Sequence, residues 1–276
     1  MAEIVAAVGV PHRPALPAEV ARVGPTHDAA QLFGAIRAEL EAVRPDVIVV
    51  FTADHLNTFF LDNLPLLTIG VTDRTAGPND GTPALPRCEL RVDERLAQHV
   101  RLEGINQCFD FGVTQEFEVD HSVLVPLHFL TPTMQIPILP IFIGGIVPPL
   151  PLARRCFALG QMLREALASF QTSTRVAVLA SGSISLDIGG PLAPHDQLAG
   201  PADQGWVKQV VGYLRSADVD GLLNATTADR LTRAGNVAGE LLNWIALLGA
   251  IGPRKPVILE PRPHHGDAFA AWRLDG

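Results

Sequence analysis

Short apolar runs rich in valine and isoleucine constrain the fold of this chain more than any other feature. Residues 4–10 (IVAAVGV), 46–51 (DVIVVF) and 175–180 (RVAVLA) are typical of short buried strands. Between the first two runs, residues 29–43 repeat their apolar positions with helical spacing. A strand, a helix and a second strand form the repeating unit of α/β proteins. The sequence therefore predicts an α/β fold, with a mostly parallel or mixed central sheet flanked by helices.

Further elements of the same kind fill most of the 276 residues. Apolar runs predict strands at 66–71 and 137–143, and a segment rich in glycine and proline predicts a loop at 72–83. Helical spacing predicts helices at 88–103, 152–170, 201–214, 227–234 and 237–251. We find no internal repeat and no low-complexity linker, so we expect a single catalytic domain spanning residues 1–276.

Charge and cysteine content exclude several classes of protein. With 21 basic and 29 acidic residues, the formal net charge is −8, which argues against a nucleic-acid or anionic-membrane partner. The three cysteines form no CxxC pair and predict no disulfide framework. Glu3 stands where a signal peptide would carry positive charge, and five prolines interrupt the most apolar stretch, 136–152. We therefore expect a cytoplasmic protein without a membrane anchor.

Two histidines follow predicted strands directly, which makes them candidate metal ligands. His12 comes after the strand 4–10, and His55 comes after 46–51. Functional sites in open α/β sheets lie beyond the carboxyl ends of the strands, where the two imidazoles could meet and bind a metal. The alternatives are that His12 is an ordinary loop residue and that Asp54 merely satisfies the ring of His55.

Glu240 is the third candidate ligand. The helical spacing of 237–251 places this residue among apolar side chains, where a charged group is costly unless it is paired or binds a metal. The alternative is a carboxylate at the edge of the buried face that reaches water or an arginine. Two histidines and one carboxylate form the facial triad of non-haem Fe(II) oxygenases, which leaves positions for substrate and dioxygen.

The remaining histidines divide into catalytic candidates and structural ones. His121, in Val-Asp-His-Ser, is a candidate general acid or base, or else a surface loop residue. His195 is a further catalytic candidate, or else a turn residue, because the proline and aspartate on either side of it favour turns. His128 lies in an apolar stretch and is expected to be a core residue. His264 and His265 either line a site or are exposed.

Several motifs resemble the class III extradiol ring-cleavage dioxygenases, the family that contains the catalytic subunit of protocatechuate 4,5-dioxygenase. These motifs are Val-Pro-His at 10–12, Phe-Thr-Ala-Asp-His-Leu-Asn-Thr-Phe-Phe at 51–60, Val-Asp-His at 119–121, Pro-Ile-Leu-Pro-Ile-Phe-Ile at 137–143, Ser-Gly-Ser-Ile-Ser at 181–185 and the late helix with Glu240. The resemblance implies that His12, His55 and Glu240 hold Fe(II). It also implies that His121 acts as an acid or base that helps to bind substrate and oxygen.

One position departs from the family pattern. The family usually carries a histidine after its late strand that takes a proton from the catechol, whereas this chain has Leu186 there, followed by Asp187. Leucine cannot accept a proton. Either Asp187 or His195 replaces this base, or the substrate needs less help, or the chemistry differs.

The resemblance implies cleavage of a catechol-type ring, protocatechuate-like or gallate-like, by O2. Three alternatives stay open: cleavage of a 2-aminophenol, hydrolysis with Zn²⁺ bound to the same ligands, and an inactive partner subunit. The family also implies a homo-oligomer, with a small second subunit that caps the site in some members. Since this chain supplies no such subunit, we expect that its own tail, residues 264–272, could complete the site.

Overall fold

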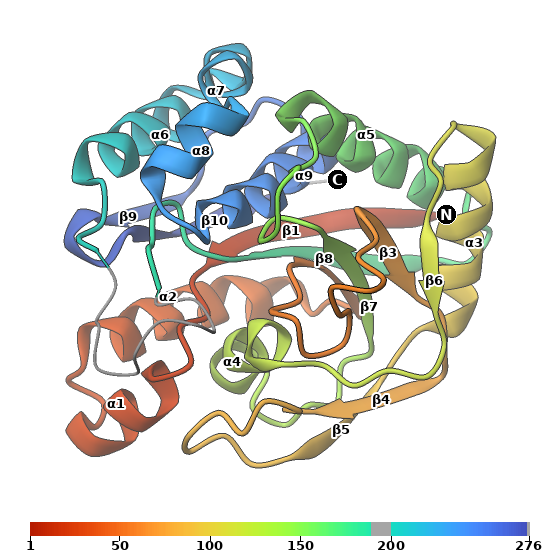
Figure 1. Cartoon of the computed structure of the whole chain (residues 1–276). Coiled ribbons are helices and arrows are strands. Elements are labelled where there is room, and N and C mark those ends of the chain that lie inside the picture. The colour runs from red at the N-terminus through yellow and green to blue at the C-terminus, as the bar shows by residue number, and fades with distance from the viewer. Residues whose placement is uncertain (189–199, 275–276) are drawn as a thin grey trace.

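The order of strands in the main sheet explains why the apolar runs are continuous rather than alternating. The computed structural model describes residues 1–188 and 200–274. Eight strands in these residues form one mixed sheet (Figure 1). Across the sheet they are β6 (Gly112–Thr114), β3 (Leu67–Gly70), β7 (Ile138–Ile143), β2 (Val47–Thr52), β8 (Thr174–Ser181), β1 (Ala2–Val10), β10 (Asp267–Arg273) and β9 (Ile258–Arg262). The central strands β7, β2, β8 and β1 run parallel. Strands β3, β10 and β9 add antiparallel pairings towards the two edges.

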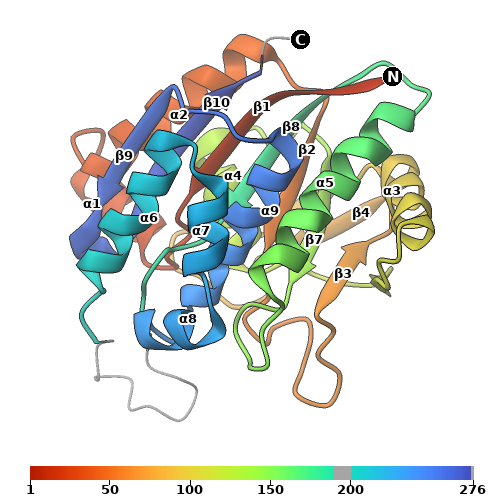
Figure 2. The ribbon, with the colours of Figure 1, turned by 90° about the horizontal axis from the view of Figure 1, so that it is seen from above.

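Helices cover both faces of this sheet (Figures 1 and 2). One layer holds α1 (Leu16–Val23), α2 (Asp28–Val43) and α4 (His121–Leu130). The other holds α3 (Glu94–Asn106), α5 (Ala153–Ser169), α6 (Gln204–Ser216), α7 (Val219–Ala225), α8 (Ala228–Ala234) and α9 (Leu241–Ile251). Two short 3-10 turns, Ala238–Glu240 and Pro263–His265, lie beside α9 and β10 in the chain. The predicted α/β fold with a flanked mixed sheet is confirmed.

The two apolar cores meet at the central strands. In β2, Val47, Val49 and Phe51 face the layer with α5 and α9, and Ile48 and Val50 face the layer with α2 and α4. Because both faces are covered, every position of such a strand is buried, which produces the apolar runs seen in the sequence.

A close crossing of α5 and α9 places the start of α9, and with it Glu240. A Cβ atom at Gly160 of α5 would lie 1.9 Å from the carbonyl oxygen of Ala246, and one at Gly249 of α9 would lie 2.0 Å from that of Phe157. Only glycine allows the two backbones to approach this closely. The crossing therefore fixes the position of α9 against α5.

Residues 72–91 differ from the sequence prediction. The expected loop at 72–83 contains β4 (Arg74–Gly77), which pairs with β5 (Cys88–Arg91) in a separate two-stranded ribbon. The helix expected from residue 88 begins only at Glu94, after Asp93 caps it by accepting from the amide of Leu96. Leu90 is buried between two exposed neighbours, which is the alternation expected of a strand. With only four residues, the alternation is too short to be recognised in the sequence. Helices α1, α4 and α7 and strands β6, β9 and β10 were also not predicted.

The C-terminal segment is a strand of the sheet and not a cover over the site. The expected cover, 264–272, contributes β10, which lies between β1 and β9 and is buried along most of its length. His264 and His265 are exposed. The expectation that this tail completes the site is therefore wrong for the strand residues, because they belong to the core.

The three cysteines are free, as expected. Among residues 1–188 and 200–274, no helix combines the length and apolarity that a membrane span requires.

Candidate metal centre

Three candidate ligands from distant parts of the chain meet at the carboxyl ends of β1 and β2. His12 follows β1, His55 follows β2, and Glu240 ends the 3-10 turn that leads into α9. The Oε1 atom of Glu240 lies 3.1 Å from Nε2 of His12 and 3.1 Å from Nε2 of His55. His12 and Glu240 are buried, and His55 is nearly so. The fold thus brings together the three residues that the sequence analysis proposed as ligands.

A serine at the end of β8 fixes the tautomer of His12. Nδ1 of His12 lies 2.8 Å from Oγ of Ser181, and that hydroxyl donates its proton to the backbone carbonyl of Ser122. Since the hydroxyl has one proton, its oxygen accepts from Nδ1–H of His12. Nε2 of His12 therefore carries a lone pair towards Glu240 when the ring is neutral. Burial lowers the pKa of His12, which favours this neutral form.

Asp120 fixes His55 in the same way. Its Oδ2 accepts from Nδ1 of His55 at 3.0 Å and from the backbone amide of His55 at 3.1 Å, and its Oδ1 caps α4 by accepting from the amide of Ser122. Burial alone would raise the pKa of Asp120, but His55 and Ser122 hold that pKa well below its usual range. Burial also lowers the pKa of His55, yet Asp120 and Glu240 outweigh it and raise the pKa to about 10.

The donor set fits a divalent cation. Oε2 of Glu240 accepts from the backbone amide of Ser183 at 2.6 Å, which leaves Oε1 for the two imidazoles. With both rings in the tautomers described, two lone pairs and a carboxylate oxygen converge on one point, an arrangement that only a proton or a cation between them stabilises. Metals bind imidazole and carboxylate at about 2.0–2.2 Å, so ligand atoms near 3 Å apart suit one shared ion.

A third histidine lies against this cluster. His121 is the first residue of α4 and is buried, with its ring centroid 4.4 Å from that of His55 and 5.4 Å from that of His12. Ring nitrogens of the three histidines lie within 4.8 Å of one another, so they form an alternative metal-binding group. Asp80 accepts from Nδ1 and from the backbone amide of His121, which aims Nε2 away from Asp80. The alternative of a surface loop histidine is therefore wrong.

Asp80 is itself positioned by a residue two places along the chain. Its Oδ1 accepts from the hydroxyl of Thr82 at 2.7 Å. Partial burial opposes ionisation of Asp80, but His121 and Thr82 lower its pKa to about 2. Asp80, Asp120 and His121 also form a second group close enough to hold a cation.

The other candidates lie elsewhere. His195 falls outside the described residues. Leu186 is half-buried, with its carbonyl accepting from the amide of Val237 at 3.2 Å, and Asp187 is exposed. His128 is half-buried against the ring of Phe129, and burial lowers its pKa.

Sequence reasoning missed the residues that orient the histidines. Ser181 and Asp120 were noticed only as parts of motifs, and Asp80 lies in a glycine- and proline-rich segment that reads as a loop. The one signal that could have found Ser181 is its place directly after the predicted strand 175–180, in the same way that His12 and His55 closely follow theirs.

Two histidines and a carboxylate at the strand ends of an α/β sheet are typical of enzymes that use a single metal ion. Within that class, the chain belongs to the family described as the catalytic LigB subunit of aromatic ring-opening dioxygenase, whose family model matches residues 6–266. The predicted membership of the ring-opening dioxygenases is thereby confirmed.

Similar proteins carry one recurring name, "2,3-dihydroxyphenylpropionate/2,3-dihydroxicinnamic acid 1,2-dioxygenase". The protein of that name from Photorhabdus laumondii is 26% identical over 80% of this chain and 80% of its own length. That from Paraburkholderia xenovorans is 32% identical over 80% of this chain and 65% of its own length. That from Burkholderia vietnamiensis is 27% identical over 88% of this chain and 84% of its own length.

A solved structure shares the fold. The crystal structure of the uncharacterized protein JW3007 from Escherichia coli K12 matches 97% of this chain and 98% of its own, with a TM-score of 0.55 and 13% sequence identity. At this identity the likeness concerns the fold alone.

Proposed function

We propose that this chain is an Fe(II)-dependent extradiol dioxygenase that opens the ring of a catechol-type substrate with O2. The observation that carries the proposal is the position of Glu240 Oε1, 3.1 Å from Nε2 of both His12 and His55. Family membership supports the reaction class, and the names of the relatives support a catechol-type substrate. Two imidazoles and a carboxylate, without thiolate, suit Fe(II).

In this proposal His12, His55 and Glu240 hold the metal. Bound Fe(II) supplies a Lewis acid and a redox centre with open positions for substrate and oxygen. We assign Glu240 to this set in preference to His121 because Oε1 faces both Nε2 atoms at equal distance. Ser181 and Asp120 keep each Nδ1 protonated, so both Nε2 atoms would offer their lone pairs to the metal.

His121 is the proposed acid and base. Asp80 accepts from its Nδ1, which leaves Nε2 of the neutral ring free to take a proton from a substrate hydroxyl and to return it later. The carboxylate of Asp80 stabilises the imidazolium that forms meanwhile. His195 and Asp187 remain the proposed substitutes for the base that the family carries at the position of Leu186.

Replacing His121 by alanine is expected to leave metal binding intact and to slow turnover about 10²-fold, the usual contribution of a general acid or base. Metal content and oxygen uptake of the same preparation measure the two effects. His264→Ala, at an exposed histidine, is the control. Loss of metal from the His121 variant would make His121 a ligand, and unchanged turnover would remove it from the mechanism.

A histidine at position 186 should restore the missing base. We expect Leu186→His to raise turnover of catechols about 10-fold or more, below the full 10²–10⁴-fold of a well-placed base. Leu186→Asn, which adds polarity without a base, should show no gain. An equal rate for the histidine variant and the wild-type chain would indicate that the proton already leaves by another route.

Metal analysis after anaerobic purification, followed by oxygen uptake with catechols and 2-aminophenols, tests the function as a whole. We expect about one iron per chain and oxygen consumption that depends on a catechol. Consumption only with aminophenols would change the substrate class. Zinc without oxygen uptake after loading with Fe(II) would favour a hydrolase, since zinc has no redox chemistry. Failure to bind any metal would favour an inactive partner subunit.

A further inference from the structure

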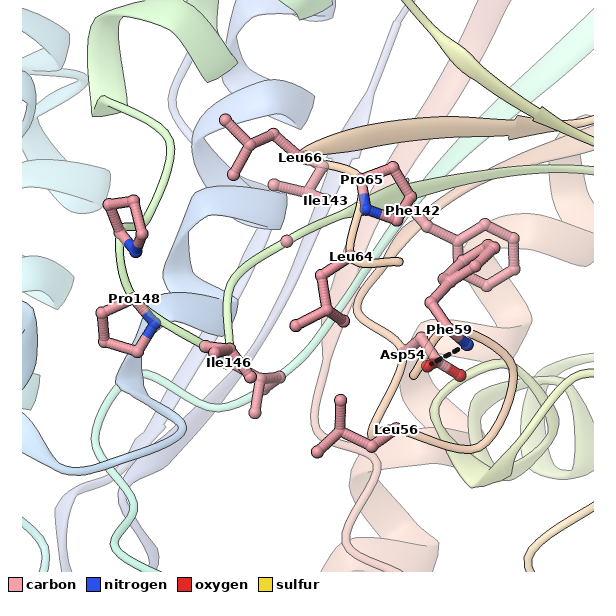
Figure 3. A pocket seen from close by; sticks show the side chains of 13 residues that line it. Asp54, Leu56, Phe59, Leu64, Pro65, Leu66, Phe142, Ile143, Ile146 and Pro148 are labelled. Carbon is pink, nitrogen blue, oxygen red and sulfur yellow. Dashed lines mark hydrogen bonds between the residues drawn. The ribbon is translucent and has the colours of Figure 1, made fainter. Parts of the chain in front are cut away.

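An apolar cavity of about 240 Å³ is lined by Asp54 and Leu56, the chain neighbours of His55 (Figure 3). Its walls come from the segment after β2, from the end of β7 and from the segment that follows β7. Leu56, Leu64 and Ile146 direct their side chains into it, and the edge-to-face rings of Phe59 and Phe142, with centroids 5.2 Å apart, form one side. Pockets that hold a whole small molecule usually measure roughly 300–1,000 Å³. This cavity therefore suits part of a ligand.

The walls of the cavity are joined directly to the proposed ligands. Asp54 and Leu56, which both line it, are the chain neighbours of His55. On the other side, Gly144 and Ile146 are the neighbours of Gly145, at which an added Cβ would lie 2.7 Å from the carbonyl oxygen of Gly239, next to Glu240. The segments that carry His55 and that pack against Gly239, next to Glu240, therefore also form walls of the cavity.

The backbone adopts an unfavourable conformation to build this wall. Leu56 has a φ of 61°, in the left-handed region that bulky side chains avoid. The chain bends at Leu56, immediately after His55, and the leucine side chain points into the cavity. Such conformations persist where the surrounding structure requires them, commonly at functional sites.

The charge of the cavity selects the chemistry of its occupant. None of the described residues that line it is a lysine, an arginine or a histidine. Asp54 is its one charged residue, and its carboxylate already accepts from the backbone amides of Asn57, Thr58 and Phe59 at 2.9–3.2 Å. A carboxylate substituent would meet no cation here and would be repelled by Asp54.

We propose that this cavity binds an uncharged, apolar substituent of the substrate ring, so that the chain prefers alkyl- or aryl-substituted catechols to carboxylate-bearing ones. The inference rests on the proposed function and narrows its substrate class. It also separates this chain from relatives whose printed name contains the acid 2,3-dihydroxyphenylpropionate.

The test compares two probes on the iron-loaded protein, 3-propylcatechol and 3-(2,3-dihydroxyphenyl)propionate, with unsubstituted catechol as the reference. We expect kcat/KM for the propyl compound to exceed that for the propionate by at least ~10-fold, since apolar contacts in a pocket discriminate by such factors. Anaerobic calorimetry of both probes measures the same preference as a ratio of Kd values, without turnover.

Leu64→Lys should reverse the preference by bringing a cation to the cavity, with a loss of ~10-fold for the propyl probe and a gain for the propionate. Leu64→Met keeps the apolar volume and should retain the wild-type order. Leu61→Lys adds the same charge at an exposed leucine of the same loop that does not line the cavity, and should change neither ratio.

The outcomes distinguish failure of the cavity assignment from failure of the proposed dioxygenase reaction. If no catechol is consumed but calorimetry favours the propyl probe, the cavity assignment holds and the proposed reaction fails. If catechol is consumed and the propionate equals or exceeds the propyl probe in both measurements, the cavity assignment is overturned and the reaction stands. The Leu64→Lys and Leu61→Lys variants could also show the same ratio of propyl to propionate preference. That result would overturn the cavity assignment, because the added charge would then act from the surface and not from within the cavity.

Discussion

Glu240→Ala is expected to bind Fe(II) at least 10²-fold more weakly than the wild-type chain and to lose ring-opening turnover altogether. Three ligands leave none to spare, and Glu240 supplies the only negative charge of the proposed set. Substitution of a residue that only orients a ligand typically lowers metal affinity 10–100-fold. Removal of a ligand itself should therefore lower the affinity by at least as much as the largest of these losses. Metal content after anaerobic dialysis at several free-iron concentrations gives the affinity.

The same measurement decides between the two possible ligand sets. Asp120→Asn keeps the shape of the group that orients His55, and we expect an intermediate loss of affinity. If Glu240→Ala retains iron and His121→Ala does not, the three histidines are the ligands and the proposed assignment is wrong. Glu240→Gln keeps the side chain's volume, and its circular dichroism spectrum separates loss of metal from loss of fold.

The central layers of the fold were predictable because burial acts on each strand separately. The apolar residues of β1, β2 and β8 report that both faces of the sheet are covered, which needs no knowledge of the partner strands. The same applies to His12 and His55. Each follows its own strand, and because β1 and β2 both run parallel to β8 between them, their carboxyl ends lie at the same edge of the sheet.

The orienting residues were not predictable, because they depend on pairs that are distant in the chain. Ser181 contacts His12 across 169 positions, and Asp80 contacts His121 across 41. A short sequence window contains only one member of each pair. The strand β5 was missed for a related reason, since its four residues become a strand only by pairing with β4.

The C-terminal strand supplies the second large effect, which concerns stability. Asp267 is fully buried at the start of β10, and Arg262 at the end of β9 holds it with two hydrogen bonds of 2.7 Å, from Nε and from one terminal nitrogen. The same guanidinium reaches Asp28 of α2, an exposed carboxylate, at 3.2 Å. Arg262 thus links β9 and β10, at one edge of the sheet, to α2, which lies near the other end of the chain.

Asp267→Ala is expected to lower the free energy of unfolding by about 3–5 kcal/mol, because it leaves the guanidinium of Arg262 buried without its main partner. Asp28→Ala removes a partner that is more than half exposed, so it should cost no more than about 1 kcal/mol. Urea unfolding of the metal-free proteins, compared at equal slopes, measures both. Arg262→Met combined with Asp267→Leu should recover much of the loss, since no charge is then stranded. Similar losses in the Asp267 single and the double variant would show that packing of the strand, and not the ion pair, carries the effect.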